Sequence, residues 1–346
     1  MAITIKDIAK AAGVSKTAVS FALNNKDGVG EATKQKILEA AQNLGYKPKE
    51  QKQADKGKYT SKHLILFLNG SRSKLTSPMT PILLELLHSI EREVTKTDHT
   101  LLFKTIKVNE NSEKNVFNVA SQNAIGGIIL NAADLEECEI ETVVQLGHPV
   151  VVIEHIVDSM DVDCIVSDNY YGGYLAATHL IELGHRAIGY IQSTVHTDNF
   201  ARRQEGFLAA LKKHGLEFKE QQIFTAPTTI EEVEATLIDK FKKSKNFPTA
   251  FFAENDTLAI GAINSMKSIG LEVPNDVSVI GYDNAEMTSL YTSPSLTSIG
   301  IPVREYAKLA VERLCARMEN PDMVSCKYIL GINLVKRESC LEMHSK

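Results

Sequence analysis

One face of a short helix near the N-terminus is expected to carry four side chains at helical spacing: Lys16, Thr17, Ser20 and Phe21. The lysine and the hydroxyl side chains can donate hydrogen bonds to base edges. A phenylalanine ring can contact a thymine methyl group, although it offers no hydrogen-bond code. A helix-turn-helix presents such positions to the major groove of DNA, so the pattern predicts sequence readout by this face.

Two helices joined by a tight turn would position this face. Apolar residues recur at helical spacing on either side of Gly13, which is predicted to end the first helix in a left-handed conformation. Thr4 and Asp7 make a weak form of the capping box, and Ser15 is a good N-cap for the second helix. The alternative is a small helical cap on a larger domain, because helix pairs are common and DNA-binding ones are a minority.

Two further observations favour DNA binding. A third helix is predicted from about Glu31 to Leu44, and Gly45 follows it. Residues 1–62 hold 12 lysines against 6 acidic residues, whereas the rest of the chain holds 26 basic against 37 acidic residues. A basic head on an acidic body is the electrostatic pattern of a nucleic-acid-binding module.

The motifs TIKDIAKAAGVSKTAVSFALNN and VGEATKQKILEAAQNLGYKP follow one another near the start of the chain. Through residue 48 the sequence resembles the three-helix headpiece of LacI/GalR-family transcriptional regulators. The resemblance implies a homodimer whose two headpieces read a pseudo-palindromic operator. The residues expected to contact DNA are Thr4, Lys6, Ser15, Lys16, Thr17, Ser20, Phe21, Asn24 and Lys34. For the lysines proposed to contact phosphates, solubility is an equally good explanation.

The composition indicates two or three domains. The chain has 346 residues, of which 43% are apolar, so it can bury substantial cores. It has no run of about 18 apolar residues and no apolar signal region, so we expect a cytoplasmic protein without membrane spans. The five cysteines are scattered and the histidines show no metal-ligand spacing. We therefore expect reduced thiols, no metal and no cofactor.

Residues 49–62 are predicted to form a polar linker that departs from the family pattern. The stretch has no apolar periodicity, and lysines recur through it. The family normally has here a short hinge helix with a leucine that wedges into the minor groove. By alignment from Pro48, Asp55 stands at that position, and an acidic side chain cannot unstack a base step. We therefore hypothesise that the headpieces and lysine–phosphate contacts bind DNA with little minor-groove insertion.

From residue 63 onward, short apolar runs alternate with helical patterns, which is typical of βαβ units and parallel sheets. Strands are predicted at 64–68, 100–106, 124–130, 149–155, 186–191, near 222, 249–254 and 276–283. Two consecutive α/β series imply two lobes with a crevice at the carboxyl ends of their strands. The layout resembles the type I periplasmic-binding-protein fold that forms the effector-binding core of the family.

The predicted fold class is an all-α helix-turn-helix headpiece plus an α/β two-lobed core with parallel sheets. The headpiece is predicted at 1–48, the atypical hinge at 49–62, and the effector-binding and dimerisation core at 63–346. Within the core, lobe 1 is expected at about 63–168 and 298–331, and lobe 2 at about 169–297 and 332–346.

Polar side chains at strand ends are expected to give the crevice its specificity. By the resemblance, Asp283 would accept hydrogen bonds from sugar hydroxyls and Arg203 would clamp ligand oxygens, although Asp283 could be a turn residue and Arg202 could exchange roles with Arg203. Asn255 matches a pocket position, and Asp256 is expected to cap the next helix. The expected effector-binding residues are Asn69, Arg72, Asp168, Gln192, Arg203, Asn255 and Asp283.

The loop after the first core strand raises a question about the ligand's charge. Arg72 and Lys74 lie in it, and such cations are usually solvated, but if turned inward they would suit an anionic ligand such as a uronate or a sugar phosphate. Ile82 and Leu83 stand where family members often have paired phenylalanines, so an aromatic platform for a sugar or a purine is missing there.

These observations favour a transcriptional regulator, most readily a repressor of sugar uptake or catabolism genes, controlled by a small carbohydrate-like effector. A solute-binding protein of a transport system is the alternative, which the basic head opposes. A protein co-effector, known for some family members, stays open. No catalytic motif such as G-x-S-x-G, a P-loop or G-x-G-x-x-G is present, so we expect no enzyme activity.

Overall fold

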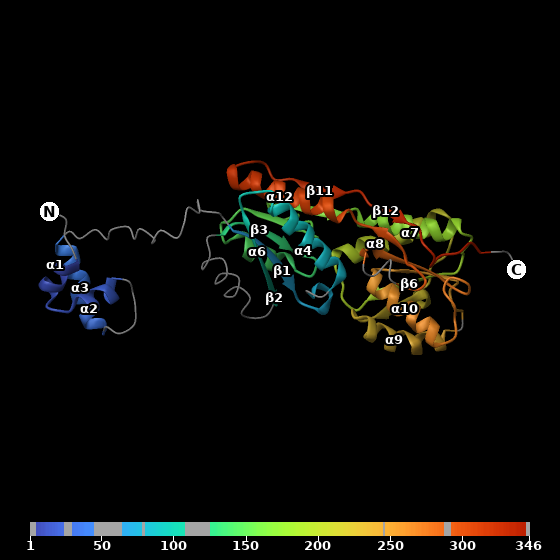
Figure 1. Ribbon diagram of the computed structural model, residues 1–346. Coiled ribbons are helices and arrows are strands. Elements are labelled where there is room, and N and C mark those ends of the chain that lie inside the picture. The colour runs from blue at the N-terminus through green and yellow to red at the C-terminus, as the bar shows by residue number, and fades with distance from the viewer. Residues whose placement is uncertain are drawn as a thin grey trace. The chain divides into compact units, whose positions relative to one another are not determined.

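The computed structural model of the chain describes residues 5–23, 30–44, 64–77, 80–107, 125–244, 246–286 and 292–343. The chain divides into two units, Met1–Ser61 and Lys62–Lys346 (Figure 1). The predicted linker, together with Thr4 and Asn24, lies outside the described residues. Within the described ranges, no helix has the length and apolar character needed to cross a membrane.

The N-terminal unit contains helices α1 (Ile5–Ala12), α2 (Lys16–Leu23) and α3 (Glu31–Asn43). Their inward faces form one small apolar core, which consists of Ile8, Ala9, Ala12, Val19, Ala22, Ile37 and Ala41. Gly13 follows α1 with a φ of 64°, the left-handed conformation that glycine adopts readily. Ser15 Oγ accepts a hydrogen bond from the Ala18 amide at 3.1 Å and so caps α2. The predicted helix-turn-helix is confirmed.

The first lobe of the core is a parallel sheet with strand order β11-β5-β4-β3-β1-β2. Its strands are β1 (Leu64–Ser71), β2 (Thr100–Lys107), β3 (Ile125–Asn131), β4 (Val150–Ile153), β5 (Asp163–Ser167) and β11 (Lys327–Leu330). Helices α4 (Pro81–Val94) and α12 (Val303–Glu319) cover one face of the sheet, and α6 (Glu137–Val144) covers the other. Because both faces are buried, the inner strands are continuous apolar runs.

The second lobe repeats this plan with strand order β12-β10-β9-β8-β6-β7. Its strands are β6 (Ile188–Ser193), β7 (Ile223–Ala226), β8 (Ala250–Ala253), β9 (Ser278–Asp283), β10 (Thr297–Gly300) and β12 (Asn333–Val335), which runs antiparallel to β10. Helices α7 (Asn169–Glu182) and α8 (Asp198–Lys213) cover one face. Helices α9 (Ile230–Lys243) and α10 (Asp256–Ser268) cover the other. The predicted two-lobed α/β core is confirmed.

The chain crosses between the lobes at Asp168, after Gly300, and between β11 and β12. The second crossing comes slightly later than the expected boundary near 298, because β10 pairs with β9 over its whole length. The predicted strands did not include β5. Its first residue, Asp163, is fully buried and accepts hydrogen bonds from Arg313 Nε at 2.8 Å and Arg317 Nε at 2.6 Å. These two partners on α12 make a buried carboxylate tolerable inside a sheet.

Gly173 and Gly206 allow α7 and α8 to approach closely. A Cβ on Gly206 would lie 1.8 Å from the carbonyl oxygen of Tyr170, and a Cβ on Gly173 would lie 1.8 Å from that of Arg203. We expect Gly206→Ala to lower the free energy of unfolding of the core by about 3 kcal/mol, because the helices must separate. Thermal melting measures this. Gly331→Ala is the control, since an added Cβ there meets nothing within 4 Å. Equal melting temperatures for the two variants would contradict the prediction.

Candidate functional site

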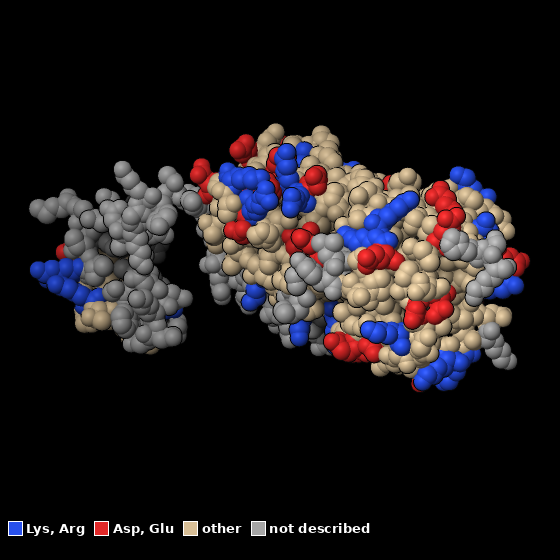
Figure 2. All heavy atoms as spheres, turned by 45° about the vertical axis from the view of Figure 1, so that its right-hand side comes forward, with Lys and Arg blue, Asp and Glu red and all other residues tan. Residues whose placement is uncertain are grey.

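The exposed face of the N-terminal unit carries several of the residues expected to contact DNA. Lys6, Lys16 and Thr17 are exposed, and Lys34 on α3 is half-buried. Ser15 is exposed as well as being the cap of α2. Ser20 and Phe21 lie within α2. Figure 2 shows lysine side chains gathered on part of this unit, whereas basic and acidic side chains are interspersed over the drawn face of the core.

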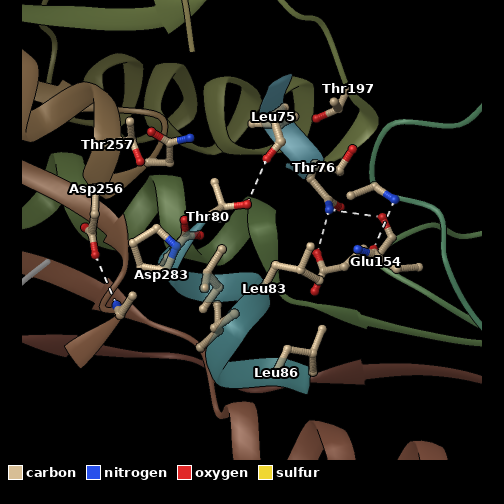
Figure 3. A pocket seen from close by; sticks show the side chains of 18 of the residues that line it. Leu75, Thr76, Thr80, Leu83, Leu86, Glu154, Thr197, Asp256, Thr257 and Asp283 are labelled. Atoms are coloured by element: carbon tan, nitrogen blue, oxygen red, sulfur yellow. Dashed lines mark hydrogen bonds between the residues drawn. The ribbon is translucent and has the colours of Figure 1, made fainter. Parts of the chain in front are cut away.

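A pocket lies between the two lobes of the core and encloses about 900 Å³, its open mouth included. The first lobe contributes aliphatic side chains from α4 and the preceding loop, with Asn131, Glu154 and Tyr306. The second lobe contributes mainly polar side chains, which are Thr197, Asn199, Arg203, Asn255, Asp256, Thr257 and Asp283. Figure 3 shows Leu83 and Thr80 between Asp283 on one side and Glu154 on the other. Both lobes therefore supply groups that a small molecule would contact together.

Arg203 is the cation of this pocket and is only 4% exposed. Its Nε donates a hydrogen bond to Asn169 Oδ1 at 2.8 Å, and its Nη1 donates to the carbonyl oxygen of Glu254. The same Nη1 lies 3.5 Å from Asp283 Oδ1, and the guanidinium carbon lies 3.5 Å from the centre of the Tyr282 ring. This ring and these acceptors fix the guanidinium plane. Arg202 instead points outward and pairs with Glu205, so the open choice between the two arginines resolves to Arg203.

The pocket carboxylates of Glu154 and Asp283 follow the ends of equivalent strands in the two lobes. β4 and β9 occupy the same place in their respective strand orders. Glu154 has a φ of 65° and Asp283 a φ of 103°, conformations that side-chain-bearing residues seldom adopt. Such backbone strain is retained mainly where a site needs it. Burial raises the pKa of both carboxyl groups, and the nearby charge of Arg203 acts in the opposite direction.

Of the residues expected to bind an effector, Arg203, Asn255 and Asp283 line the pocket. The structure places the other four elsewhere: Asn69, Arg72, Asp168 and Gln192. Asp168 caps α7 by accepting a hydrogen bond from the Tyr171 amide at 2.9 Å, and Gln192 donates to Thr225 on the neighbouring strand. These two are structural because their polar groups are used locally.

Asn69 and Arg72 also do other work than line the pocket. Asn69 is fully buried beneath the lining, where it donates to the carbonyl oxygen of Thr76 at 2.8 Å. Arg72 turns outward and pairs with Glu136 and Glu139. Lys74, 64% exposed, pairs with Glu232 of the second lobe at 2.6 Å. The two cations that suggested an anionic ligand are therefore not in the pocket lining.

Asn255 and Asp256 have the reverse of the expected roles at the start of α10. Asn255 Oδ1 accepts a hydrogen bond from the Leu258 amide at 2.9 Å and caps the helix. Asp256 does not cap it but accepts hydrogen bonds from the Ser298 hydroxyl at 2.6 Å and the Ala285 amide at 3.2 Å. The prediction that Asp256 caps this helix was wrong, because the helix begins one residue earlier than that assignment needs. Both side chains line the pocket.

The sequence reasoning missed several lining residues. Asn131 ends β3 and could have been found by the same strand-end rule that selected Asn69. Asn199 and Thr197 lie at the start of α8, with no strand pattern to mark them. Tyr306 comes from α12, far along the chain, and its hydroxyl accepts a hydrogen bond from the Glu154 amide at 2.9 Å. Only the tertiary fold brings Tyr306 to this place.

Glu254 lies behind Arg203 and makes core stability depend on pH. It is 5% exposed, and burial raises its pKa from 4.5 to about 7. Between these values the folded chain holds a proton that the unfolded chain has lost. The stabilising contribution is therefore fully present below about pH 4.5 and is lost as the pH rises to about 7.

We expect Glu254→Gln to remove this dependence. The difference in the free energy of unfolding between wild type and variant should change by about 3 kcal/mol across that pH range, measured by chemical denaturation. Gln keeps an oxygen for the Ser193 amide, which donates to Glu254 Oε2 at 2.6 Å. Glu217→Gln, at a site 85% exposed, is the matched control. Parallel pH profiles for wild type and Glu254→Gln would contradict the assignment.

Comparisons with known proteins agree with this geometry. Residues 4–49 match the model of bacterial regulatory proteins of the lacI family, and residues 177–340 match a periplasmic binding protein-like domain. The chain is 32% identical over 320 residues to the HTH-type transcriptional repressor PurR of Aliivibrio salmonicida, and the match covers 92% of each chain.

Solved structures have the same fold. The transcriptional regulator CelR in complex with cellobiose matches with a TM-score of 0.71 at 22% identity, over 97% of this chain and 99% of that one. The Lac repressor dimer bound to operator and the anti-inducer ONPF matches with a TM-score of 0.70 at 23% identity, over 99% of this chain and 100% of that one.

A helix-turn-helix unit joined to a two-lobed core with a polar pocket defines a DNA-binding transcription regulator of the ligand-controlled class. The chain belongs to the lacI family of bacterial regulatory proteins, and it is a DNA-binding transcriptional repressor rather than an enzyme.

Proposed function

We propose that the protein acts in the cytoplasm as a homodimeric repressor of sugar uptake or catabolism genes, and that a sugar or sugar derivative in the pocket controls its binding to a pseudo-palindromic operator. The observation that carries this proposal is the buried pair of Arg203 and Asp283, at 3.5 Å, in the pocket wall between the lobes. A guanidinium and a carboxylate side by side offer donors and acceptors that match adjacent hydroxyl groups.

Ligand contacts from both lobes supply the coupling to DNA. Asn131 and Glu154 belong to the first lobe, and Arg203 and Asp283 belong to the second. A ligand that touches all of them prefers one arrangement of the lobes, and this difference in affinity is what allows it to change operator binding. A ligand with equal affinity for both arrangements would change nothing.

A purine effector with purine-synthesis target genes is the second candidate. The PurR repressors among the relatives favour it. The pocket wall offers Phe200 and Tyr306 as aromatic side chains, whereas Ile82 and Leu83 are aliphatic. Hydrogen bonding to hydroxyl groups therefore suits the wall better than ring stacking does.

The test uses an operator selected from random duplex DNA by the full-length chain. Operator retention in a gel-shift assay is then measured with neutral sugars and with purine bases, alongside the melting temperature of the protein. We expect a sugar to raise the melting temperature and to change operator retention. A response to a purine base and not to any sugar would replace the first candidate with the second. Failure to select any DNA sequence would overturn both.

The linker gives a separate prediction about the shape of the bound DNA. Asp55 stands where the family has an inserting leucine, and this position lies outside the described residues. We expect circular-permutation gels to show little bending at the operator centre, because no apolar wedge unstacks a base step there. We also expect Asp55→Leu to increase the bend, and a large bend in the wild-type complex would contradict the hypothesis.

A further inference from the structure

We propose that the effector carries a protonated amine and that Glu154 binds this amine, while Arg203 and Asp283 bind the ligand's hydroxyl groups. This inference rests on the proposed function, because it concerns the small molecule that enters the same pocket.

The charges of the pocket wall are unequal. The wall contains three carboxylates, those of Glu154, Asp256 and Asp283, against the single guanidinium of Arg203. Arg72 and Lys74 pair with acidic residues outside the wall, so they do not offset this excess. An anionic ligand would add a further negative charge to a partly buried site, whereas a cationic ligand would balance one already there.

The partners of the three carboxylates differ. Asp283 faces Arg203 at 3.5 Å. Asp256 lies at the N-terminus of α10 and accepts hydrogen bonds from Ser298 and Ala285, which together with the positive end of the helix stabilise its charge. Glu154 has a neutral partner, the side-chain amide of Asn199, which donates to its Oε2 at 2.8 Å. Glu154 is therefore the wall carboxylate whose charge is least well compensated.

The backbone around Glu154 holds this carboxylate in place. Its amide donates a hydrogen bond to the Tyr306 hydroxyl at 2.9 Å, and that hydroxyl donates to the carbonyl oxygen of Ile165. Asn199 Nδ2 also donates to the Glu154 carbonyl oxygen, at 3.0 Å. These bonds fix a left-handed conformation, φ 65°, that a glycine would adopt at lower cost. A side chain kept at a position that favours glycine is expected to have a use.

Protonation linkage gives the inference a distinctive signature. Burial raises the pKa of Glu154. An ammonium group beside the carboxylate would lower that pKa again, so binding an amine would release a proton to the buffer. A neutral sugar could instead accept a hydrogen bond from the protonated carboxyl group, and its binding would then release no proton. The two cases differ in how the measured heat depends on the buffer.

The experiment compares matched probes on the full-length chain. Isothermal titration is performed with glucosamine, glucose and N-acetylglucosamine, and with the corresponding galactose series, in phosphate and in Tris buffer. We expect an amine to bind at least about tenfold more tightly than its hydroxyl and N-acetyl counterparts, with proton release. We expect Glu154→Gln to abolish that preference while keeping the affinity for the neutral sugar, and Asp283→Asn to weaken both.

The outcomes separate this inference from the proposed function. Tighter binding of a neutral sugar, an equal effect of Glu154→Gln on both probes, or no binding of any amine at about 10 mM would overturn the amine assignment. If a neutral sugar also changed operator retention, the proposed function would stand without it. If an amine bound but no ligand changed operator retention, the amine assignment would stand and the proposed control of DNA binding would fail. Neutral-sugar affinity and thermal melting of each variant show that it is folded.

Discussion

Val19→Asp is expected to abolish operator binding by the full-length chain while leaving the core intact. Val19 is fully buried in the apolar core that joins the three helices of the N-terminal unit. A carboxylate there would lose its hydration without gaining a partner, at a cost of about 3 kcal/mol or more. A unit with so small an apolar core has little stability to lose. We therefore expect it to unfold and operator affinity to fall at least about 100-fold.

Gel shift with the selected operator measures the loss, and the melting temperature of the core together with ligand binding shows that the second unit is unaffected. Ala11→Asp is the matched control, because Ala11 is exposed on α1 and the same charge stays in water there. Its operator affinity should change little more than one added surface charge allows. Normal operator binding by Val19→Asp would show that this core does not hold the DNA-binding unit together.

The sequence was most informative where local chemistry decides the structure. Gly13 and Ser15 fix the turn between α1 and α2 through backbone conformation and one side-chain hydrogen bond, and both act within a few residues. The continuous apolar runs of β1, β3 and β9 predict buried strands for an equally local reason. Strand β5 escaped because Asp163 opens it, and the arginines that balance this carboxylate come from α12, distant in sequence.

The pocket was harder to predict because a strand-end position does not say which way a side chain turns. Asn69 and Asn131 end neighbouring strands and hydrogen-bond to each other, yet only Asn131 reaches the pocket wall. Arg72 was a candidate for an anionic ligand, but two glutamates of the α6 region draw it outward. Such choices depend on partners that the fold brings from elsewhere, and they reversed the expected charge of the site.

Arg203→Ala is expected to remove the response to the effector and to destabilise the core. The guanidinium serves acceptors from three elements: Asn169, the Glu254 carbonyl oxygen and Asp283. Alanine would leave these acceptors buried without their donor, and Asp283 would lose the cation that offsets its burial. Truncating one partner of a buried charge pair costs about 2–5 kcal/mol. We therefore expect effector affinity to fall at least about 100-fold and the core to melt at a lower temperature.

Arg203→Lys separates charge from shape, because it keeps the positive charge but loses the planar fork and its stacking on Tyr282, where the guanidinium carbon lies 3.5 Å from the ring centre. We expect this variant to recover part of the stability and little of the effector response. Arg202→Ala is the neighbouring control, since Arg202 is exposed and pairs only with Glu205 among the described residues. Titration of each variant with the effector, followed by operator gel shift, measures both effects. If Arg202→Ala lost the response and Arg203→Ala kept it, the recognition role would belong to the outer arginine, and the buried one would serve only to join α7, α8 and β9.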